Sequence, residues 1–136
     1  MSKSASRHIT FIALFIIYLG VVAYLCFGHP AAFIKIPRTI TLLKWTVPTD
    51  KFIHFLMFFP YPFLAQEAFY FNNKWRSLVF VILTALAFCF TFELLQDEIT
   101  KNLPYRRTSD PWDLSVNIAA VSIGSLIVSI YNLFRK

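Results

Sequence analysis

Three pairs of polar residues lie at spacings that put both members of a pair on one face of a helix. The pairs are Asp50 with His54, Glu93 with Gln96, and Asp113 with Asn117. Residues three or four positions apart are neighbours on a helix surface. A carboxylate beside an imidazole is a common arrangement for general acid and base chemistry. We therefore expect these side chains to be capable of proton transfer.

Glu93 is the most unusual member of this set, because it lies inside the apolar run 90–95. A charged side chain at the centre of a membrane helix costs roughly 2.5 to 3.5 kcal/mol on insertion scales. A basic partner such as Arg107, or protonation of the carboxylate, would offset that cost. A structural interpretation fits equally well, in which Glu93, Arg107 and Asp113 form an ion network that joins two helix ends. Both interpretations stay open.

The other polar residues also have simpler structural roles. Asp50 and Asp113 each lie where an apolar run begins, and a carboxylate there can cap a helix. His54, near a helix entrance, can be an interfacial residue that forms hydrogen bonds. Asp50, Glu93 and Asp113 could together hold a divalent cation, but no ligand spacing specifies one. We predict no metal and no cofactor.

The composition requires an apolar environment for most of the chain. Of 136 residues, 57% are hydrophobic and 15% are charged, and the mean hydropathy is +0.60. These values exclude a disordered chain and a water-soluble fold. The net charge of +6 is spread along the chain in ones and twos, so nucleic acid is not an expected partner. Cys26 and Cys89 both lie in apolar runs and are predicted to be buried thiols.

Four apolar runs are each close to the roughly 20 helical residues that cross a bilayer. They cover residues 9–27, 52–71, 77–95 and 114–134. The predicted fold class is therefore an all-α membrane protein, a bundle of four transmembrane helices that forms a single domain over 1–136. Polar residues cluster at helix ends on one membrane side. We expect no sheet, and we expect Pro60 and Pro62 to kink the second helix.

The connections determine the side on which the polar pairs lie. With four spans, the long segment 28–50 and the polar loop 96–113 emerge on the same side. Prolines and alternating apolar and basic residues predict that 28–50 lies along the membrane surface. Lysine and arginine nearly balance across the two sides, but Lys3 and Arg7 before the first run favour cytoplasmic termini.

Several motifs, taken in order, resemble the VanZ-like family of small bacterial membrane proteins. They are Asp50-Lys51-Phe52-Ile53-His54-Phe55, Glu93-Leu94-Leu95-Gln96, Arg107 with Asp113 six residues later, Asn117 and Gly124. The resemblance covers residues 50–124, which is 75 of 136 residues. The chain departs from the family pattern at Tyr105 and Ala120, where glycine is common. These departures concern local packing and leave the polar set intact.

The resemblance implies a multi-pass protein of the bacterial cytoplasmic membrane with a role in the cell envelope. The family is named for an accessory protein that gives low-level resistance to teicoplanin-type glycopeptide antibiotics. Of the two neighbouring arginines, Arg106 and Arg107, the spacing to Asp113 favours Arg107 as the motif arginine.

The residues together predict a polar pocket near one membrane surface. The predicted catalytic residues are His54, Glu93 and Asp113. The predicted substrate-binding residues are Asp50, Lys51, Gln96, Arg107, Asp110 and Asn117. Arg107 and Lys51 would hold an anionic group, such as that of a lipid-linked envelope precursor or glycopeptide target. Membrane lipids are the expected partners.

Three classes of function are compatible with this pocket. One is a membrane enzyme that acts on an envelope lipid or glycopeptide target. Another is a non-catalytic structural or lipid-binding membrane protein. The third is a small proton-coupled carrier, which is the least favoured because carriers usually place charges at mid-membrane on repeated halves. Here the charges lie at one end, and no repeat is visible.

Overall fold

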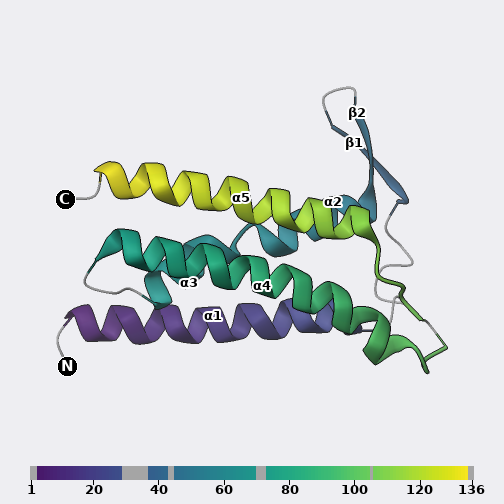
Figure 1. Cartoon of the computed structure of the whole chain (residues 1–136), viewed down its shortest axis with the longest axis horizontal. Helices are drawn as coiled ribbons and strands as arrows, with labels where there is room; N and C mark the ends of the chain where they lie inside the picture. Colours follow the sequence, from purple (N-terminus) through teal and green to yellow (C-terminus); the bar gives the residue numbers. More distant parts are fainter. Residues whose placement is uncertain (1–2, 29–36, 43–44, 70–72, 105, 135–136) are drawn as a thin grey trace.

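The computed structural model is a helical bundle with one small hairpin at its end (Figure 1). It describes residues 3–28, 37–42, 45–69, 73–104 and 106–134. In chain order the elements are α1 (Lys3–Phe27), β1 (Thr39–Leu42), β2 (Trp45–Pro48), α2 (Thr49–Phe58), α3 (Tyr61–Ala68), α4 (Lys74–Thr100) and α5 (Pro111–Phe134). The predicted helical character of the chain is confirmed.

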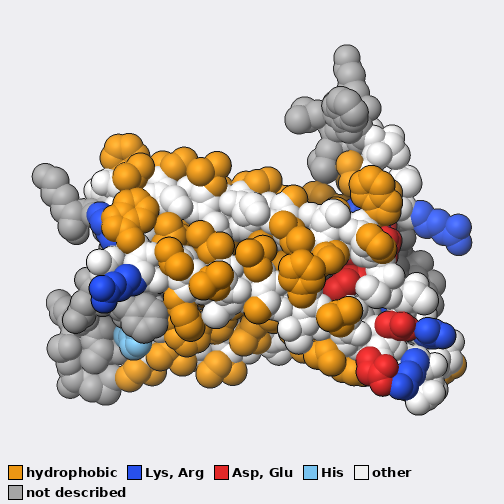
Figure 2. Space-filling model, viewed as in Figure 1, with side chains coloured by type: hydrophobic (Ala, Val, Ile, Leu, Met, Phe, Trp, Pro, Cys, Tyr) orange, Lys and Arg blue, Asp and Glu red, His pale blue; other side chains and the backbone are white. Residues whose placement is uncertain are grey.

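Three of the described helices are long and apolar enough to cross a membrane. They are Ser6–Phe27 within α1, α4 and α5, and their most apolar stretches have mean hydropathies of 2.5, 2.5 and 1.9. Even a 22-residue helix measures about 33 Å at ~1.5 Å per residue, against about 30 Å of hydrocarbon. Hydrophobic side chains cover the middle of the molecule, and charged side chains gather toward its two ends (Figure 2).

The predicted kink in the second helix is a full break, because the chain forms two helices, α2 and α3, on either side of Phe59 and Pro60. Pro60 and Pro62 have no N–H and cannot continue the ladder of helical hydrogen bonds. The Tyr18 hydroxyl on α1 donates to the Met57 carbonyl at 2.5 Å, which gives a carbonyl beside the break a partner. The helices α2 and α3 together occupy the place of the predicted second span.

This break directs the two short helices toward different neighbours. α2 packs on α5, whereas α3 packs mainly on α1 and also contacts α4 and α5. An aromatic cluster fills the centre, where the ring centroids of Phe88 and Phe92 lie 4.2 Å apart and those of Phe58 and Phe88 lie 5.3 Å apart. Within the described residues, α1 and α2 are not among the pairs of elements that pack closely.

A two-stranded hairpin is present where the sequence predicts no sheet, so that expectation is wrong. β1 and β2 pair antiparallel, with Thr39 opposite Pro48 and Leu42 opposite Trp45. Threonine alternates with apolar residues in β1, which is the period-two pattern of a strand. The hairpin projects sideways from the end of the bundle (Figure 1). Residues 29–36 of the predicted surface segment lie outside the described residues.

The two ends of the chain lie at one end of the bundle, and the hairpin and the α4–α5 loop lie at the other (Figure 1). This is the predicted placement of segments 28–50 and 96–113 relative to each other. The helices α1 and α4 both extend beyond their apolar runs, because polar residues at their ends continue the helix.

Gly124 on α5 is closely packed against the break between α2 and α3. A Cβ atom there would lie 2.9 Å from the Phe59 carbonyl oxygen and 3.1 Å from Pro62 Cγ. We predict that Gly124→Ala destabilises the protein by about 1 to 3 kcal/mol, the usual cost of overpacking, and lowers Tm in detergent. Gly20→Ala is the control, because nothing lies within 4 Å of its added Cβ. An equal Tm for the two variants would contradict the close packing at Gly124.

Candidate functional site

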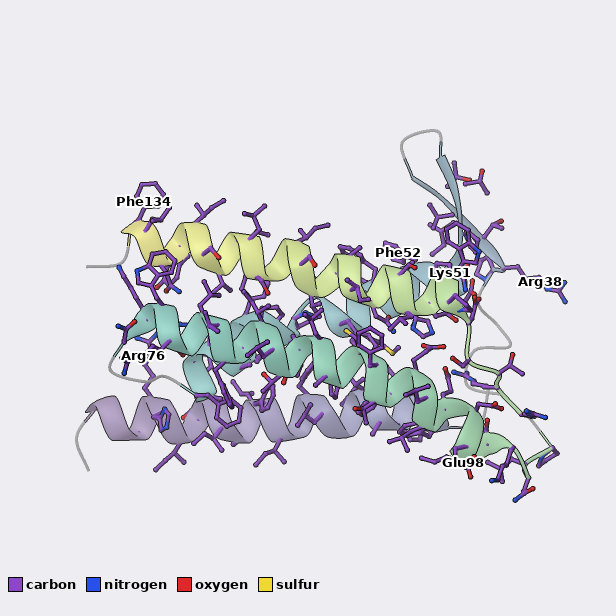
Figure 3. The ribbon with its side chains drawn as sticks, in the orientation of Figure 1. Arg38, Lys51, Phe52, Arg76, Glu98 and Phe134 are labelled. Carbon is purple, nitrogen blue, oxygen red and sulfur yellow. The ribbon has the colours of Figure 1, made fainter. Side chains whose placement is uncertain are left out.

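Lys51 joins three carboxylates at the starts of α2 and α5. Its ammonium donates to Asp110 Oδ2 and Asp113 Oδ1, both at 2.6 Å, and lies 3.4 Å from Asp50 Oδ2. An ammonium has three donors and no acceptor, which suits this acceptor set. Figure 3 shows Lys51 at the hairpin end of the bundle, where α2 and α5 begin. Lys51 thereby holds the α4–α5 loop and α5 against α2.

These contacts change the titration of two of the groups. Hydrogen bonds from Lys51 hold the pKa of the Asp110 carboxyl below its usual value, and the Trp112 N–H acts in the same direction. Burial of the Lys51 ammonium lowers its pKa, but hydrogen bonds to Asp110 and Asp113 outweigh burial, and the net pKa is raised. Both shifts keep the pair ionised over a wider pH range.

His54 is buried between Asn117 and Asp113. Its Nδ1 lies 3.1 Å from Asn117 Oδ1, and its Nε2 lies 3.7 Å from Asp113 Oδ2. Because a carbonyl oxygen only accepts, Nδ1 is the donor in the first contact. The second nitrogen, Nε2, faces the Asp113 carboxylate at a distance longer than a hydrogen bond. This arrangement brings the predicted pair partners from α2 and α5 together.

Glu93 is 3% exposed, and its Oε1 accepts the backbone N–H of Asp110 at 2.7 Å. This hydrogen bond compensates part of the cost of burying a carboxylate. Within the described residues, Glu93 and Arg107 form no ion pair, so the partnership considered from the sequence is absent there. Glu93 instead ties the end of the α4–α5 loop to α4.

Asp110 is the residue that caps α5. Its Oδ1 accepts the N–H of Trp112 at 2.9 Å, and Pro111 follows it as the first helical residue. The capping role considered for Asp113 therefore belongs to Asp110. α2 begins with no side-chain cap, so the cap considered for Asp50 is not formed.

Arg107 and Gln96 both donate to the last backbone carbonyls of α1. Gln96 Nε2 lies 3.0 Å from the Cys26 oxygen, and Arg107 Nη1 lies 3.3 Å from the Leu25 oxygen and 3.5 Å from the Cys26 oxygen. Carbonyls at a helix end have no partner within the helix, so these donors satisfy them. Arg106 instead pairs with Asp97 at 2.9 Å on the exposed side of the loop. The two neighbouring arginines thus have different partners: Arg107 contacts α1, whereas Arg106 contacts Asp97.

A pocket of about 670 Å³ opens among these groups at the hairpin end of the bundle. Six predicted site residues line it, and they are Asp50, His54, Gln96, Arg107, Asp110 and Asp113. The other three are not lining residues, namely Lys51, Glu93 and Asn117. Each of these three instead contacts a residue that lines the pocket: Lys51 contacts Asp113, Asn117 contacts His54, and Glu93 contacts Asp110.

Sequence reasoning missed part of the lining. The missed residues are Leu25, Pro37, Arg38, Thr49, Ile53, Met57, Arg106 and Thr108. Ile53 and Met57 share a helical face with Asp50 and His54, and that spacing could have revealed them. The base of the hairpin was not predictable, because it is fixed by a backbone bond from Thr49 to the Arg38 carbonyl at 3.0 Å. Arg38 itself extends away from the bundle end (Figure 3).

We predict that Asp110→Asn lowers Tm at about pH 7 and has a smaller effect at about pH 2.5. Asparagine keeps the helix cap but loses the charge that Lys51 holds. Because the folded-state pKa of Asp110 is lowered, its stabilisation is present above the ordinary carboxyl pKa and is lost as pH falls through the lowered value.

Asp97→Asn is the control for this pH dependence, because it removes a carboxylate that pairs with Arg106 at the surface of the same end. It should change Tm little at either pH. A constant difference between wild type and Asp110→Asn across this pH range would show that the contact with Lys51 does not carry the effect.

No group of three or more His, Cys, Asp and Glu side chains in the described part of the chain is arranged to hold a metal ion. Asp50 and Asp113, considered above as ligands of a divalent cation, lie around the Lys51 ammonium. In comparisons with known proteins, no family model, no curated protein and no solved structure matches this chain.

Proposed function

We propose that this chain is a VanZ-like integral protein of the bacterial cytoplasmic membrane that binds the anionic head group of an envelope lipid or lipid-linked precursor. Cells that carry it would gain low-level resistance to teicoplanin-type glycopeptides, as the motif resemblance implies. The observation that carries the binding proposal is the pocket at the helix ends, which His54, Arg107 and Asp113 line together.

The arginine supports binding of an anion. Arg107 contacts the carbonyls of α1 only through Nη1, at 3.3 and 3.5 Å. Among the described residues, its Nε and Nη2 donors form no hydrogen bond, so they remain available to a ligand. A guanidinium can offer two parallel N–H donors to a phosphate or carboxylate. Arg107 is therefore the residue that we expect to contact the head group directly.

The histidine supports proton transfer to or from a bound head group. His54 lines the pocket, Asn117 orients its ring, and Asp113 lies beside its second nitrogen. A catalytic imidazole is oriented through one ring nitrogen, here by Asn117, and exchanges its proton at the other, which here is the Nε2 that also faces Asp113. In an enzyme of this kind, His54 would be the general base or acid, with Asp113 as its partner.

One observation favours the second candidate, a non-catalytic lipid-binding protein. Glu93 is absent from the pocket lining and holds a backbone N–H, and Lys51 is occupied by carboxylates. Two of the nine predicted site residues thus have structural contacts that explain their presence. Binding requires only the remaining residues, and we propose binding as the shared property of both candidates.

We propose that both termini lie in the cytoplasm. The described residues at the end of the bundle that carries the termini include Arg7, Lys74 and Arg76 as cations, and Glu67 is the single acid of the sequence there. The remaining six acids lie toward the site end. Because lysine and arginine nearly balance between the two ends, the proposal rests on the flank of the first helix, where Lys3 and Arg7 are cations with no acid beside them in the sequence, as is typical of the cytoplasmic side.

This orientation predicts which single cysteines react with an impermeant thiol reagent in intact cells. In a background without Cys26 and Cys89, cysteines that replace Thr39 or Asn102 should be labelled, whereas one that replaces Ser6 should not. All three positions are exposed in the fold, so accessibility depends on the membrane. Labelling at Ser6 alone would invert the orientation, and labelling of Thr39 and Asn102 from opposite sides would contradict the arrangement of the bundle.

The function is tested by teicoplanin susceptibility of cells that express each variant, normalised to the amount of protein in the membrane. Arg107→Gln and His54→Gln should lose at least half of any protection that wild type gives. Glu93→Gln should keep it, because the amide oxygen can still accept the Asp110 N–H. Lys101→Gln is the control, since it removes a cation that pairs with Glu98 on the surface.

Three results would contradict the proposal. The first is protection by Arg107→Gln equal to that of wild type, which would remove the anion site. The second is no change in susceptibility on expression of wild type, which would remove the resistance role. The third is an equal loss of protection in Arg107→Gln and Lys101→Gln, which would show that protection depends on the positive charge at this end of the bundle and not on the pocket.

A further inference from the structure

One face of α2 forms a continuous wall of the pocket. Its lining residues are Thr49, Asp50, Ile53, His54 and Met57. These positions repeat at helical spacing and cover about 12 Å along the helix at ~1.5 Å per residue. Asp50 lies near the outer end of this wall, and the apolar side chains of Ile53 and Met57 lie deeper along it. The wall therefore changes from polar to apolar with depth.

The other lining residues come from several elements: Leu25 from α1, Gln96 from α4 and Asp113 from α5, with the rest in the hairpin base and the α4–α5 loop. Leu25 of α1 is a lining residue, and α1 and α2 do not pack closely on each other in the described part of the chain. They meet again where the Tyr18 hydroxyl donates to the Met57 carbonyl at 2.5 Å. We call the apolar part of the pocket, lined by Leu25 of α1 and by Ile53 and Met57 of α2, the cleft.

The volume of the whole pocket exceeds what a head group alone requires. At about 670 Å³, it lies in the range of pockets of roughly 300 to 1,000 Å³ that bind whole small molecules. Apolar side chains of α1 are also exposed, with exposed fractions of 51% for Val21 and 67% for Tyr24. A ligand in the surrounding apolar phase would meet this apolar surface first.

We infer that the occupant is a phosphate-bearing lipid, with its head group at Arg107 and its hydrocarbon chain in the cleft between α1 and α2. This inference rests on the proposed function and names the class of ligand. The lipid enters sideways between the two helices, and Leu25, Ile53 and Met57 contact its chain. A soluble phosphate has no apolar surface to bury against these three side chains, whereas a lipid removes its hydrocarbon chain from water by packing against them.

The experiment compares alkyl phosphates that share one head group and differ only in chain length. Methyl, octyl and dodecyl phosphate are titrated into the purified full-length protein in a neutral maltoside detergent, and binding is measured by calorimetry and by the shift of Tm. We expect octyl and dodecyl phosphate to bind at least tenfold more tightly than methyl phosphate. Arg107→Gln should weaken the binding of all three.

Variants in the cleft separate chain binding from partition into the micelle. Ile53→Trp fills the cleft. It should weaken the binding of octyl and dodecyl phosphate at least tenfold and leave the binding of methyl phosphate unchanged. Leu56→Trp is the control, because it adds the same ring to the exposed side of α2 and should change nothing. Ile53→Phe serves as the second cleft variant if Ile53→Trp does not yield a monodisperse protein.

The outcomes distinguish this inference from the proposed function. Equal affinity for methyl and dodecyl phosphate would overturn the lipid inference and leave an anion site intact. An equal loss of affinity for octyl and dodecyl phosphate in Ile53→Trp and Leu56→Trp would also overturn it, because the chain would then lie outside the cleft. If none of the three phosphates binds, or if Arg107→Gln binds them as well as wild type does, the anion-binding proposal itself fails.

Discussion

The ammonium of Lys51 is the contact on which the polar end of the bundle depends. It lies in α2 and donates to two aspartates that follow about sixty positions later in the chain. Without it, three carboxylates would lie close together with no described ammonium among them, which is costly for partly buried charges. Asp113 divides its two oxygens between Lys51 at 2.6 Å and His54 at 3.7 Å. The position of the imidazole's partner is therefore set by the lysine.

The helix break at Pro60 affects the shape of the pocket, whereas Lys51 affects the charge beside it. Both α2 and α3 contact α5, but only α3 also packs on α1 and α4. The break lies just after Met57, the last residue of α2 that lines the pocket, so it ends the α2 wall of the pocket. The prolines are therefore remote from the polar groups and still determine the space those groups face.

The sequence alone was sufficient for the features that depend on residue type and spacing. Hydrophobic runs located α1, α4 and α5, and helical spacing placed Asp50 with His54 and Asp113 with Asn117. The contacts made by Glu93, Gln96 and Arg107 could not be predicted, because their partners are backbone groups that any residue carries. Pairing between β1 and β2 was missed for a related reason, since a short strand pattern inside an otherwise apolar chain is a weak signal.

The pocket residues Gln96 and Arg107 are joined to α1 by hydrogen bonds to its backbone alone. Gln96 and Arg107 contact α1 through the carbonyl oxygens of Leu25 and Cys26, and every amino acid presents the same oxygen. Substitution among apolar residues of suitable size would leave both hydrogen bonds in place. The end of α1 is thus held to the loop by its backbone, whereas its middle is held by side chains, namely the buried Phe15 and Val22 and the Tyr18 hydroxyl.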